Sequence, residues 1–254
     1  MIIDTHSHVY LEQFDNDRNL VIENALKSGI ERIILPNIDS SSINQMNKTY
    51  NLNPDIFEMA LGLHPTSVEE NYQTELDSIF NVFDAKKYIA IGEIGIDLYW
   101  DKTFFKQQQH VFDFQLSFAK ENKLPVIIHA RNSLDEIIDV MKPHFNSDLT
   151  GVFHCFPGNS EQAKLVIDKG FYIGIGGVLT YKKSNMPEVV RNIPLESILL
   201  ETDAPYLSPV PKRGKRNEPS YVSYVAEYLS GLIDCDFDLV CSKTTQNAKD
   251  LFNL

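Results

Sequence analysis

The chain begins Met1-Ile2-Ile3-Asp4-Thr5-His6-Ser7-His8, a short apolar run followed within a few residues by two histidines. If this run is a buried strand, the two-residue period of its side chains puts His6 and His8 on one face at the carboxyl end. Two imidazoles placed in this way can bind one cation, so a metal site is the first hypothesis. A His-x-His pair is also common by chance, and the other ligands must come from further along the chain.

Short β-rich runs recur along the whole chain, and amphipathic segments separate them. The expected strands are Ile2–His6, Arg32–Asn37, Phe57–Leu63, Tyr88–Glu93, Val126–His129, Gly151–His154, Phe171–Gly177 and Ile198–Asp203. The expected helices are Leu20–Ser28, Thr74–Phe83, Phe104–Asn122, Leu134–Lys142, Ser160–Lys169, Pro187–Asn192, Tyr221–Ile233 and Phe237–Phe252. This alternation is typical of a (β/α)8 TIM barrel, although an open doubly wound sheet shows it too. We expect an α/β protein with one barrel domain over residues 1–254.

The composition restricts the class of protein further. With 35 acidic against 23 basic residues the net charge is −12, so the field of the whole protein repels a polyanion, and any nucleic acid must be bound locally. The chain has three cysteines, Cys155, Cys235 and Cys241, and no two of them are spaced as C-x-x-C. This pattern favours a reducing compartment over a disulfide scaffold. No secretory signal opens the chain, and no apolar run approaches the ~18 residues of a membrane span. We therefore expect a soluble cytoplasmic protein with no membrane partner.

Metal-competent side chains stand at the ends of five of the expected strands. They are His6 and His8 on the first strand, Glu93 on the fourth, His129 on the fifth, His154 on the sixth and Asp203 on the eighth. Barrel active sites gather at the carboxyl ends of strands. One such side chain could be a satisfied buried group, but buried His, Glu and Asp are costly unless paired or metal-bound. Five strand ends of this kind indicate a site rather than a core.

Four histidines and two carboxylates exceed the ligands of one structural zinc and suit two divalent ions that share a carboxylate. Glu93 is the expected bridge, because it lies between the first strand and the fifth and sixth. We assign one ion to His6, His8, Glu93 and Asp203, and the other to Glu93, His129 and His154. A hydroxide shared by the ions would be the nucleophile, with Asp203 as proton acceptor. Such ligands accept Zn²⁺, Mn²⁺, Co²⁺ or Mg²⁺, so the metal stays open.

A second group of residues is expected around this centre. Arg131 lies two residues beyond His129, where it could bind a substrate phosphate or form a salt bridge at the barrel rim. His64, at the end of the third strand, could donate a hydrogen bond to a substrate phosphate or could be a structural histidine. Glu201 could orient a ligand, hold a third ion or remain a buried carboxylate. Asp97, in the loop after Glu93, is a weaker candidate for a residue of the site.

A basic run, Lys212-Arg213-Gly214-Lys215-Arg216, follows the eighth strand. Such runs are usually solvated loops, but the barrel fold would place this one over the metal face, where Arg213 and Arg216 could contact phosphates. Tyr99 and Trp100, after the fourth strand, are candidates for base stacking or for packing under their loop. Cys155 has the wrong strand parity to join His154 and is expected to pack outside the barrel.

The motifs resemble those of one known family from end to end. They are IDTHSH at 3–8, GLHP at 62–65, IGEIGID at 91–97, PVIIHAR at 125–131, FHCFPG at 153–158, GIGGVLTYK at 174–182, ETDAPYL at 201–207 and PKRGKRNEP at 211–219. In this order they resemble the TatD-like metal-dependent deoxyribonucleases, a branch of the amidohydrolase-like barrels. The resemblance implies a TIM barrel, a binuclear metal centre on the six residues above, and phosphodiester hydrolysis. Many barrel relatives bridge their metals with a carboxylated lysine, where this chain carries Glu93, as the TatD-like group does.

The expected function is therefore a divalent-metal-dependent phosphodiester hydrolase acting on DNA as an exonuclease, on single-stranded or frayed ends. Two alternatives stay open. One is ester or amide hydrolysis at the same centre, such as removal of a D-amino acid from tRNA, which is ascribed to some TatD-like proteins. The other is a non-catalytic nucleic-acid-binding module. The motifs do not determine the oligomeric state, and a monomer is one of the possibilities.

Overall fold

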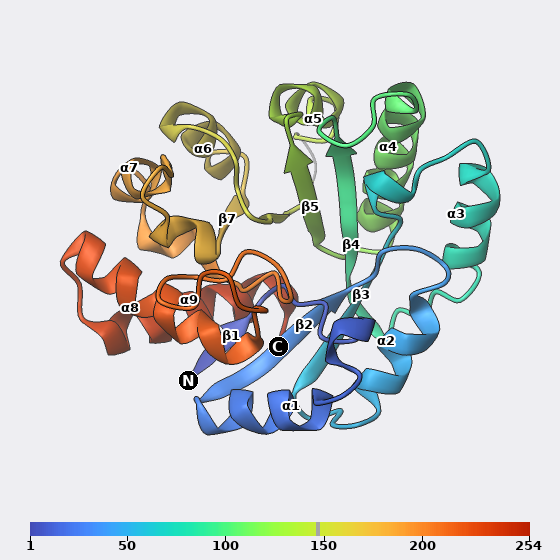
Figure 1. The fold of residues 1–254 in the computed structure, drawn as a ribbon. Helices are drawn as coiled ribbons and strands as arrows, with labels where there is room; N and C mark the ends of the chain where they lie inside the picture. Colours follow the sequence, from blue (N-terminus) through green and yellow to red (C-terminus); the bar gives the residue numbers. More distant parts are fainter. Residues whose placement is uncertain (146–147) are drawn as a thin grey trace.

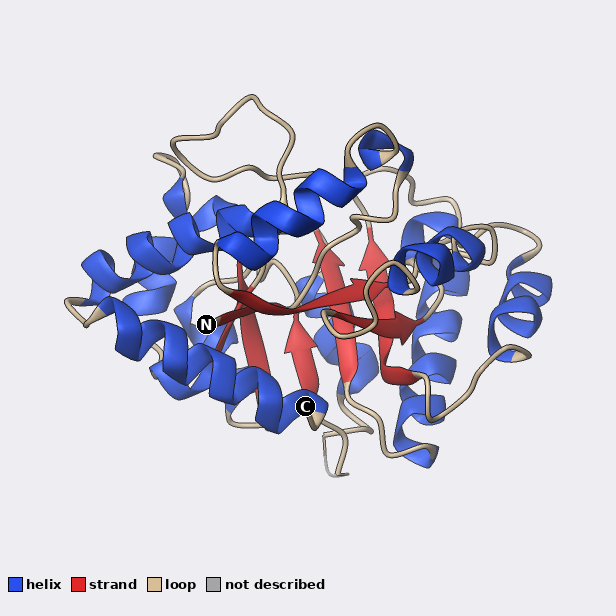
Figure 2. Ribbon diagram, turned by 90° about the horizontal axis from the view of Figure 1, so that it is seen from below, coloured by secondary structure: helices blue, strands red, loops and turns tan. Residues whose placement is uncertain are grey.

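The computed structural model describes residues 1–145 and 148–254. Its strands form one parallel sheet in the order of the sequence, and helices surround them (Figures 1 and 2). The strands are β1 (Ile2–Asp4), β2 (Ile30–Pro36), β3 (Phe57–Leu61), β4 (Tyr88–Asp97), β5 (Val126–Arg131), β6 (Gly151–Phe153), β7 (Phe171–Ile175) and β8 (Ile198–Leu200). The prediction of a (β/α)8 barrel is confirmed, and the open doubly wound sheet is excluded.

The barrel is nearly closed, and the seam lies between β8 and β1. No regular ladder joins these two strands in the described part of the chain. Instead, the Thr5 amide donates to the Leu200 carbonyl at 3.0 Å, and Ser7 forms an isolated bridge with Ala204. The Asp203 amide donates to the His6 carbonyl at 2.9 Å. These contacts bring the two segments that carry His6, His8 and Asp203 side by side.

Several strands end earlier than the sequence predicted, whereas β4 and β5 continue further. Strand β1 ends at Asp4 and β8 at Leu200, so His8 and Asp203 lie in loops beyond the sheet. Strand β6 ends before Cys155. Parity along a strand therefore does not determine where these three side chains point.

The helices agree closely with the expected ones, with one omission. They are α1 (Arg18–Lys27), α2 (Ile43–Tyr50), α3 (Tyr72–Phe80), α4 (Phe105–Glu121), α5 (Leu134–Met141), α6 (Ser160–Ile167), α7 (Met186–Arg191), α8 (Val222–Ile233) and α9 (Phe237–Phe252). Helix α2 was not predicted, because it is short and polar and buries only Met46 and Thr49. Among the described residues no helix is long and apolar enough to span a membrane.

A layer of small and branched side chains fills the barrel below the site. Its buried members on the strands are Ile3, Ile34, Ala60, Ala90, Ile127, Val152 and Leu199, and the partly buried Tyr172 of β7 packs against them. Ala248, Leu251 and Phe252 of α9 pack against it, and Figure 1 shows α9 beside β1. Because side chains alternate along a strand, His129 and His154, two residues beyond Ile127 and Val152, face the same interior. The packed layer is thus the floor on which the polar site rests.

Two glutamines of α4 hold the upper ends of β3 and β4. The Gln115 side chain accepts from the Leu63 amide at 2.7 Å and donates to the Leu63 carbonyl at 3.2 Å. Gln108 accepts from the Asp97 amide at 2.9 Å. Both glutamines are buried, so these bonds are shielded from water. They fix the backbone next to His64 and Asp97.

Candidate metal centre

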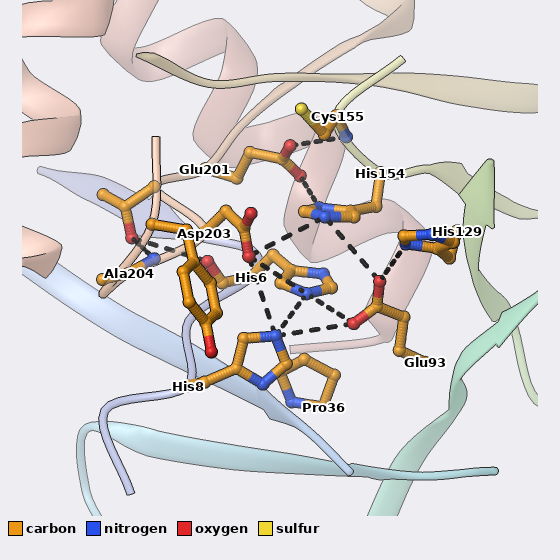
Figure 3. Close-up of polar contacts among 12 residues, drawn as sticks. His6, His8, Pro36, Glu93, His129, His154, Cys155, Glu201, Asp203 and Ala204 are labelled. Carbon is orange, nitrogen blue, oxygen red and sulfur yellow. Dashed lines mark hydrogen bonds and ion pairs between the residues drawn. The ribbon is translucent and has the colours of Figure 1, made fainter. Parts of the chain in front are cut away.

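Six side chains, predicted from strand ends scattered along the chain, converge at one rim of the barrel (Figure 3). The His6 and His154 rings stack with their centroids 3.4 Å apart. His6 Nε2 lies 3.1 Å from both His8 Nε2 and Glu93 Oε2. Bridged ions sit about 3.5–4 Å apart, so ligands of one binuclear centre must be this close.

Glu93 lies between two sets of histidines. Its Oε2 faces His6 at 3.1 Å and His8 at 3.5 Å, whereas its Oε1 faces His129 at 2.9 Å. Burial opposes the negative charge, but His6, His64 and hydrogen bonds from His129 and His6 hold the pKa of the carboxyl well below its usual range. The carboxylate stays ionised and offers one oxygen to each side, which suits a bridging ligand.

Asp203 faces the same cluster from the loop after β8. Its Oδ1 lies 3.7 Å from His8 Nε2, 3.9 Å from His154 Nε2 and 4.0 Å from His6 Nε2. Its backbone is left-handed, with φ at 59°, a conformation that Asp and Asn adopt more readily than most residues. Burial raises the pKa of Asp203 to about 6, against the lowering influence of His154 and His8.

Each of three histidines is oriented by a partner on its outer nitrogen. His129 Nε2 lies 2.9 Å from Asp97, and His154 Nδ1 lies 3.0 Å from Glu201. His8 Nδ1 lies 3.0 Å from the Tyr10 hydroxyl, which donates to the Pro36 carbonyl at 2.7 Å and so accepts from the ring. When a metal ion binds, the inner nitrogens would supply their lone pairs to it while the outer partners hold the rings in place, as in metal sites whose ligands have such partners. The donor set therefore fits divalent ions.

Space for the Glu201 carboxylate depends on a glycine in β7. A Cβ added at Gly174 would lie 2.6 Å from Glu201 Oε2 and 3.0 Å from the Phe153 carbonyl. Glu201 also accepts from the Cys155 amide at 2.6 Å and is buried behind His154. Its position suits the ligand-orienting role among the alternatives set out above, and it does not line the substrate cavity.

Within the described residues, three overlapping groups could each hold an ion. They are His6, His8 and Asp203; His6, Glu93 and His154; and His64, Glu93 and His129. The third group was not anticipated, because His64 was expected either to contact a substrate phosphate or to be a structural histidine. Its Nε2 lies 3.4 Å from Glu93 Oε1, closer than the 3.8 Å of His154 Nε2. The ligand set of the second ion stays a prediction, with His64 added as a candidate.

A cavity of about 720 Å³ opens over this cluster. Its lining includes Glu93, Asp203 and four histidines of the cluster, together with the exposed Arg131 and Trp100. The four histidines are His8, His64, His129 and His154. Cys155 also lines the cavity, so the prediction that it packs outside the barrel is wrong. Burial raises the pKa of its thiol well above the usual range, which favours the protonated sulfur.

The basic run after β8 does not line the cavity. Arg216 binds Asp17 through both terminal nitrogens, at 2.8 and 2.7 Å, and donates to the Gln13 carbonyl at 2.6 Å. Arg213 stacks on the Tyr181 ring, with the guanidinium carbon 3.9 Å from the ring centroid. Arg216 thus ties its loop to the start of α1, a position that the sequence pattern did not indicate.

Metal binding to this centre should depend on pH through His154. Burial lowers the pKa of His154, but Glu201, helped by Glu93 and Asp203, raises it to about 10. An ion must displace that proton, so below this pKa the affinity falls as the pH falls. Between about pH 7 and 9, where Asp203 is already ionised, His154 should contribute up to about tenfold in affinity per pH unit.

Calorimetric metal titrations at several pH values measure this dependence. Glu201→Gln removes the charge that raises the pKa of His154, so the variant should show a flatter pH profile and release less proton on binding. Lys243 pairs with Glu196 at 3.2 Å on the surface, and Glu196→Gln is the matched control. Equal pH profiles for the wild type and Glu201→Gln would show that metal binding does not displace a proton from His154.

Comparison with known proteins identifies the family. The family model of TatD related DNase matches residues 3–253. The metal-dependent hydrolase YabD of Bacillus subtilis strain 168 is 40% identical over all of both chains. The crystal structure of YjjV, a TatD homolog of Escherichia coli K12, has a TM-score of 0.92 at 32% identity, with 100% of this chain and 98% of that chain covered.

A TatD family hydrolase of Entamoeba histolytica has a TM-score of 0.84 at 23% identity, over 99% of this chain and 97% of that one, which supports the same fold. These matches run from end to end and are to metal-dependent hydrolases, so they do not support the alternative of a non-catalytic nucleic-acid-binding module. The chain therefore belongs to the TatD-related DNase family and is a metal-dependent hydrolase.

Proposed function

We propose that this protein hydrolyses phosphodiester bonds in DNA from an exposed strand end, using two divalent ions. One observation carries the proposal: a convergent cluster of imidazoles and carboxylates lines a cavity together with an exposed arginine. The family description supports DNA as the substrate. His6, His8, Glu93 and Asp203 would hold one ion, and Glu93, His129 and His154, with His64 nearby, the other.

The bound ions would supply Lewis acidity, which activates water and stabilises charge on the phosphate oxygens. Asp203 is the proton acceptor, because its Oδ1 faces the centre and its side chain is open to the cavity. Arg131 lies two residues beyond His129 and binds a substrate phosphate through its planar guanidinium. Water adds to phosphorus, the bond to the leaving oxygen breaks, and a phosphomonoester and an alcohol result.

The size of the cavity supports action at strand ends. A volume of about 720 Å³ is that of a site for a small ligand. A cavity of this size can receive the terminal nucleotide of a single strand. Linear and circular single-stranded DNA of the same sequence test this directly. An exonuclease degrades the linear form alone, whereas equal cleavage of both would show internal attack.

The substrate class is tested by assaying one purified, metal-loaded sample on single-stranded DNA and on a D-aminoacyl-tRNA. We expect DNA cleavage and no release of the amino acid. The opposite result would assign the centre to ester hydrolysis, because the same ions can act on a carbonyl carbon.

Arg131→Ala should weaken DNA binding and flatten its salt dependence without removing metal. Each lost phosphate contact reduces the slope of log affinity against log salt by about 0.7 for a single strand. The slope is measured from KM between low and physiological salt. Arg216→Ala is the matched control, because Asp17 already neutralises Arg216. Equal slopes for the wild type and Arg131→Ala would show that the phosphates are bound elsewhere.

A further inference from the structure

We propose that Tyr99, Trp100 and Arg131 form a binding site for an unpaired nucleobase, next to the phosphate that is cleaved. This site, which we call the stacking platform, rests on the proposed DNA hydrolysis and names its substrate more closely. It would select a strand whose terminal base is free to leave its neighbours.

The two aromatic side chains are open to solvent at the entrance of the site. Trp100 is 69% exposed and Tyr99 is 53% exposed. Their rings meet edge to face, with centroids 4.9 Å apart. Trp100 lines the cavity that also contains His129 and Arg131, and it lines a second, small pocket of about 80 Å³ as well. Packing beneath the loop, the alternative set out from the sequence, does not describe rings that are this exposed.

Arg131 is held against the same rings. Its guanidinium carbon lies 4.1 Å from the Tyr99 ring centroid and 5.2 Å from that of Trp100. A guanidinium that lies over an aromatic ring keeps its N–H groups in its own plane, where they can donate to a phosphate. In the described structure Arg131 forms no ion pair with an acidic residue. A nucleotide can therefore place its base on the indole and its phosphate on the guanidinium.

The backbone of the platform is anchored to the catalytic rim by Asp97. One oxygen of this buried carboxylate accepts from the amides of Tyr99, at 2.9 Å, and Trp100, at 3.2 Å. The other oxygen lies 2.9 Å from His129 Nε2. The Leu98 amide also donates to the Arg131 carbonyl at 2.9 Å. The carboxylate that orients a proposed metal ligand therefore also fixes the platform, so a base stacked there has a defined place relative to the scissile phosphate.

Two consequences follow for the substrate. Every nucleobase has a π-face, so stacking tolerates any sequence, whereas a base within a duplex is already stacked on both sides. The protein has a net charge of −12, so its overall field repels DNA. Uncharged contacts such as stacking therefore contribute a larger share of the affinity for DNA. The platform thus favours single-stranded ends over paired ones.

Trp100 is the only tryptophan in the sequence, so tryptophan fluorescence reports on the platform alone. The Asp203→Asn variant, loaded with Mg²⁺, is titrated with a short single-stranded oligonucleotide and with an abasic oligonucleotide of the same length. We expect the normal oligonucleotide to quench the fluorescence and the abasic one to leave it nearly unchanged. Absence of quenching by the normal oligonucleotide at saturation would overturn the platform.

Kinetics on the metal-loaded enzyme give a second measurement. Trp100→Ala should raise KM for single-stranded DNA about 5- to 100-fold, the usual range for one lost stacking contact, with little change in kcat. Trp100→Phe should recover most of that loss. Tyr228→Ala, which removes an aromatic side chain that is 42% exposed on α8, is the control and should change nothing. For the abasic oligonucleotide, Trp100→Ala and the wild type should have the same KM.

The outcomes separate the platform from the proposed function. If the wild type cleaves DNA, and Trp100→Ala has an unchanged KM, the platform is wrong while the hydrolase survives. If the normal oligonucleotide quenches Trp100 but the loaded wild type cleaves no DNA, the platform stands as a nucleic-acid site, and the proposed reaction is wrong.

Discussion

Asp203→Asn should leave a folded, metal-binding protein that has lost most of its turnover on DNA. The amide keeps the size of the side chain and one oxygen ligand, but it cannot accept the proton that Asp203 is proposed to take. Loss of a positioned general base typically costs about 10²–10⁴-fold in rate. The left-handed backbone at φ 59° suits Asn as well as Asp, so the loop should keep its conformation.

The measurement is kcat on linear single-stranded DNA together with the metal content of the same sample. Asp234→Asn is the matched control, because Asp234 is also left-handed, at φ 51°, and lies at the end of α8. The control should behave as the wild type. Wild-type turnover by Asp203→Asn with its metal in place would show that another group accepts the proton.

Glu93→Gln should remove metal and activity together. Glu93 is buried, and its two oxygens face His6, His8 and His129 within 3.5 Å. An amide supplies one neutral oxygen and a nitrogen that cannot bind a cation, so both ion positions lose a ligand. Loss of an outer partner already costs about 10–100-fold in metal affinity, and loss of a bridging ligand should cost more.

The affinity for the added divalent ion and the rate of DNA cleavage are measured side by side. Glu58→Gln in β3 is the control, because Glu58 is a partly buried carboxylate 3.6 Å from Arg32 and away from the site. Added metal should restore Glu93→Gln only partly. Full metal binding by Glu93→Gln would show that Glu93 does not bridge the ions.

The general plan of the site was predictable because it depends on short-range sequence patterns. Apolar runs that end in His or Glu mark strand ends, and a parallel barrel brings those ends to one rim. His129 and His154 followed from this rule, since each lies two residues beyond an interior residue of the packed layer. The fold and the positions of the strand ends predicted that the six residues lie near one another, although His8 and Asp203 turned out to lie in loops beyond the sheet.

The parts that were missed depend on contacts between distant segments. Tyr10 orients His8 only because the Pro36 carbonyl of β2 accepts its hydroxyl proton. Arg216 is held by Asp17, 199 residues away in the chain, so its exclusion from the cavity has no local signal. Cys155 was misplaced because its backbone is left-handed, with φ at 42°, so strand parity does not extend from β6 to this residue. The orienting role of Asp97 had a weak signal, as a carboxylate just past the expected fourth strand.

The most direct test of the central proposal is a metal titration of the chelator-treated protein, with bound metal and cleavage of linear single-stranded DNA measured in each sample. We expect no cleavage without metal, a rise in cleavage with loading, and a plateau when two ions are bound per chain. A fully loaded protein that leaves DNA intact, or a metal-free protein that cleaves it at the same rate, would contradict the proposal.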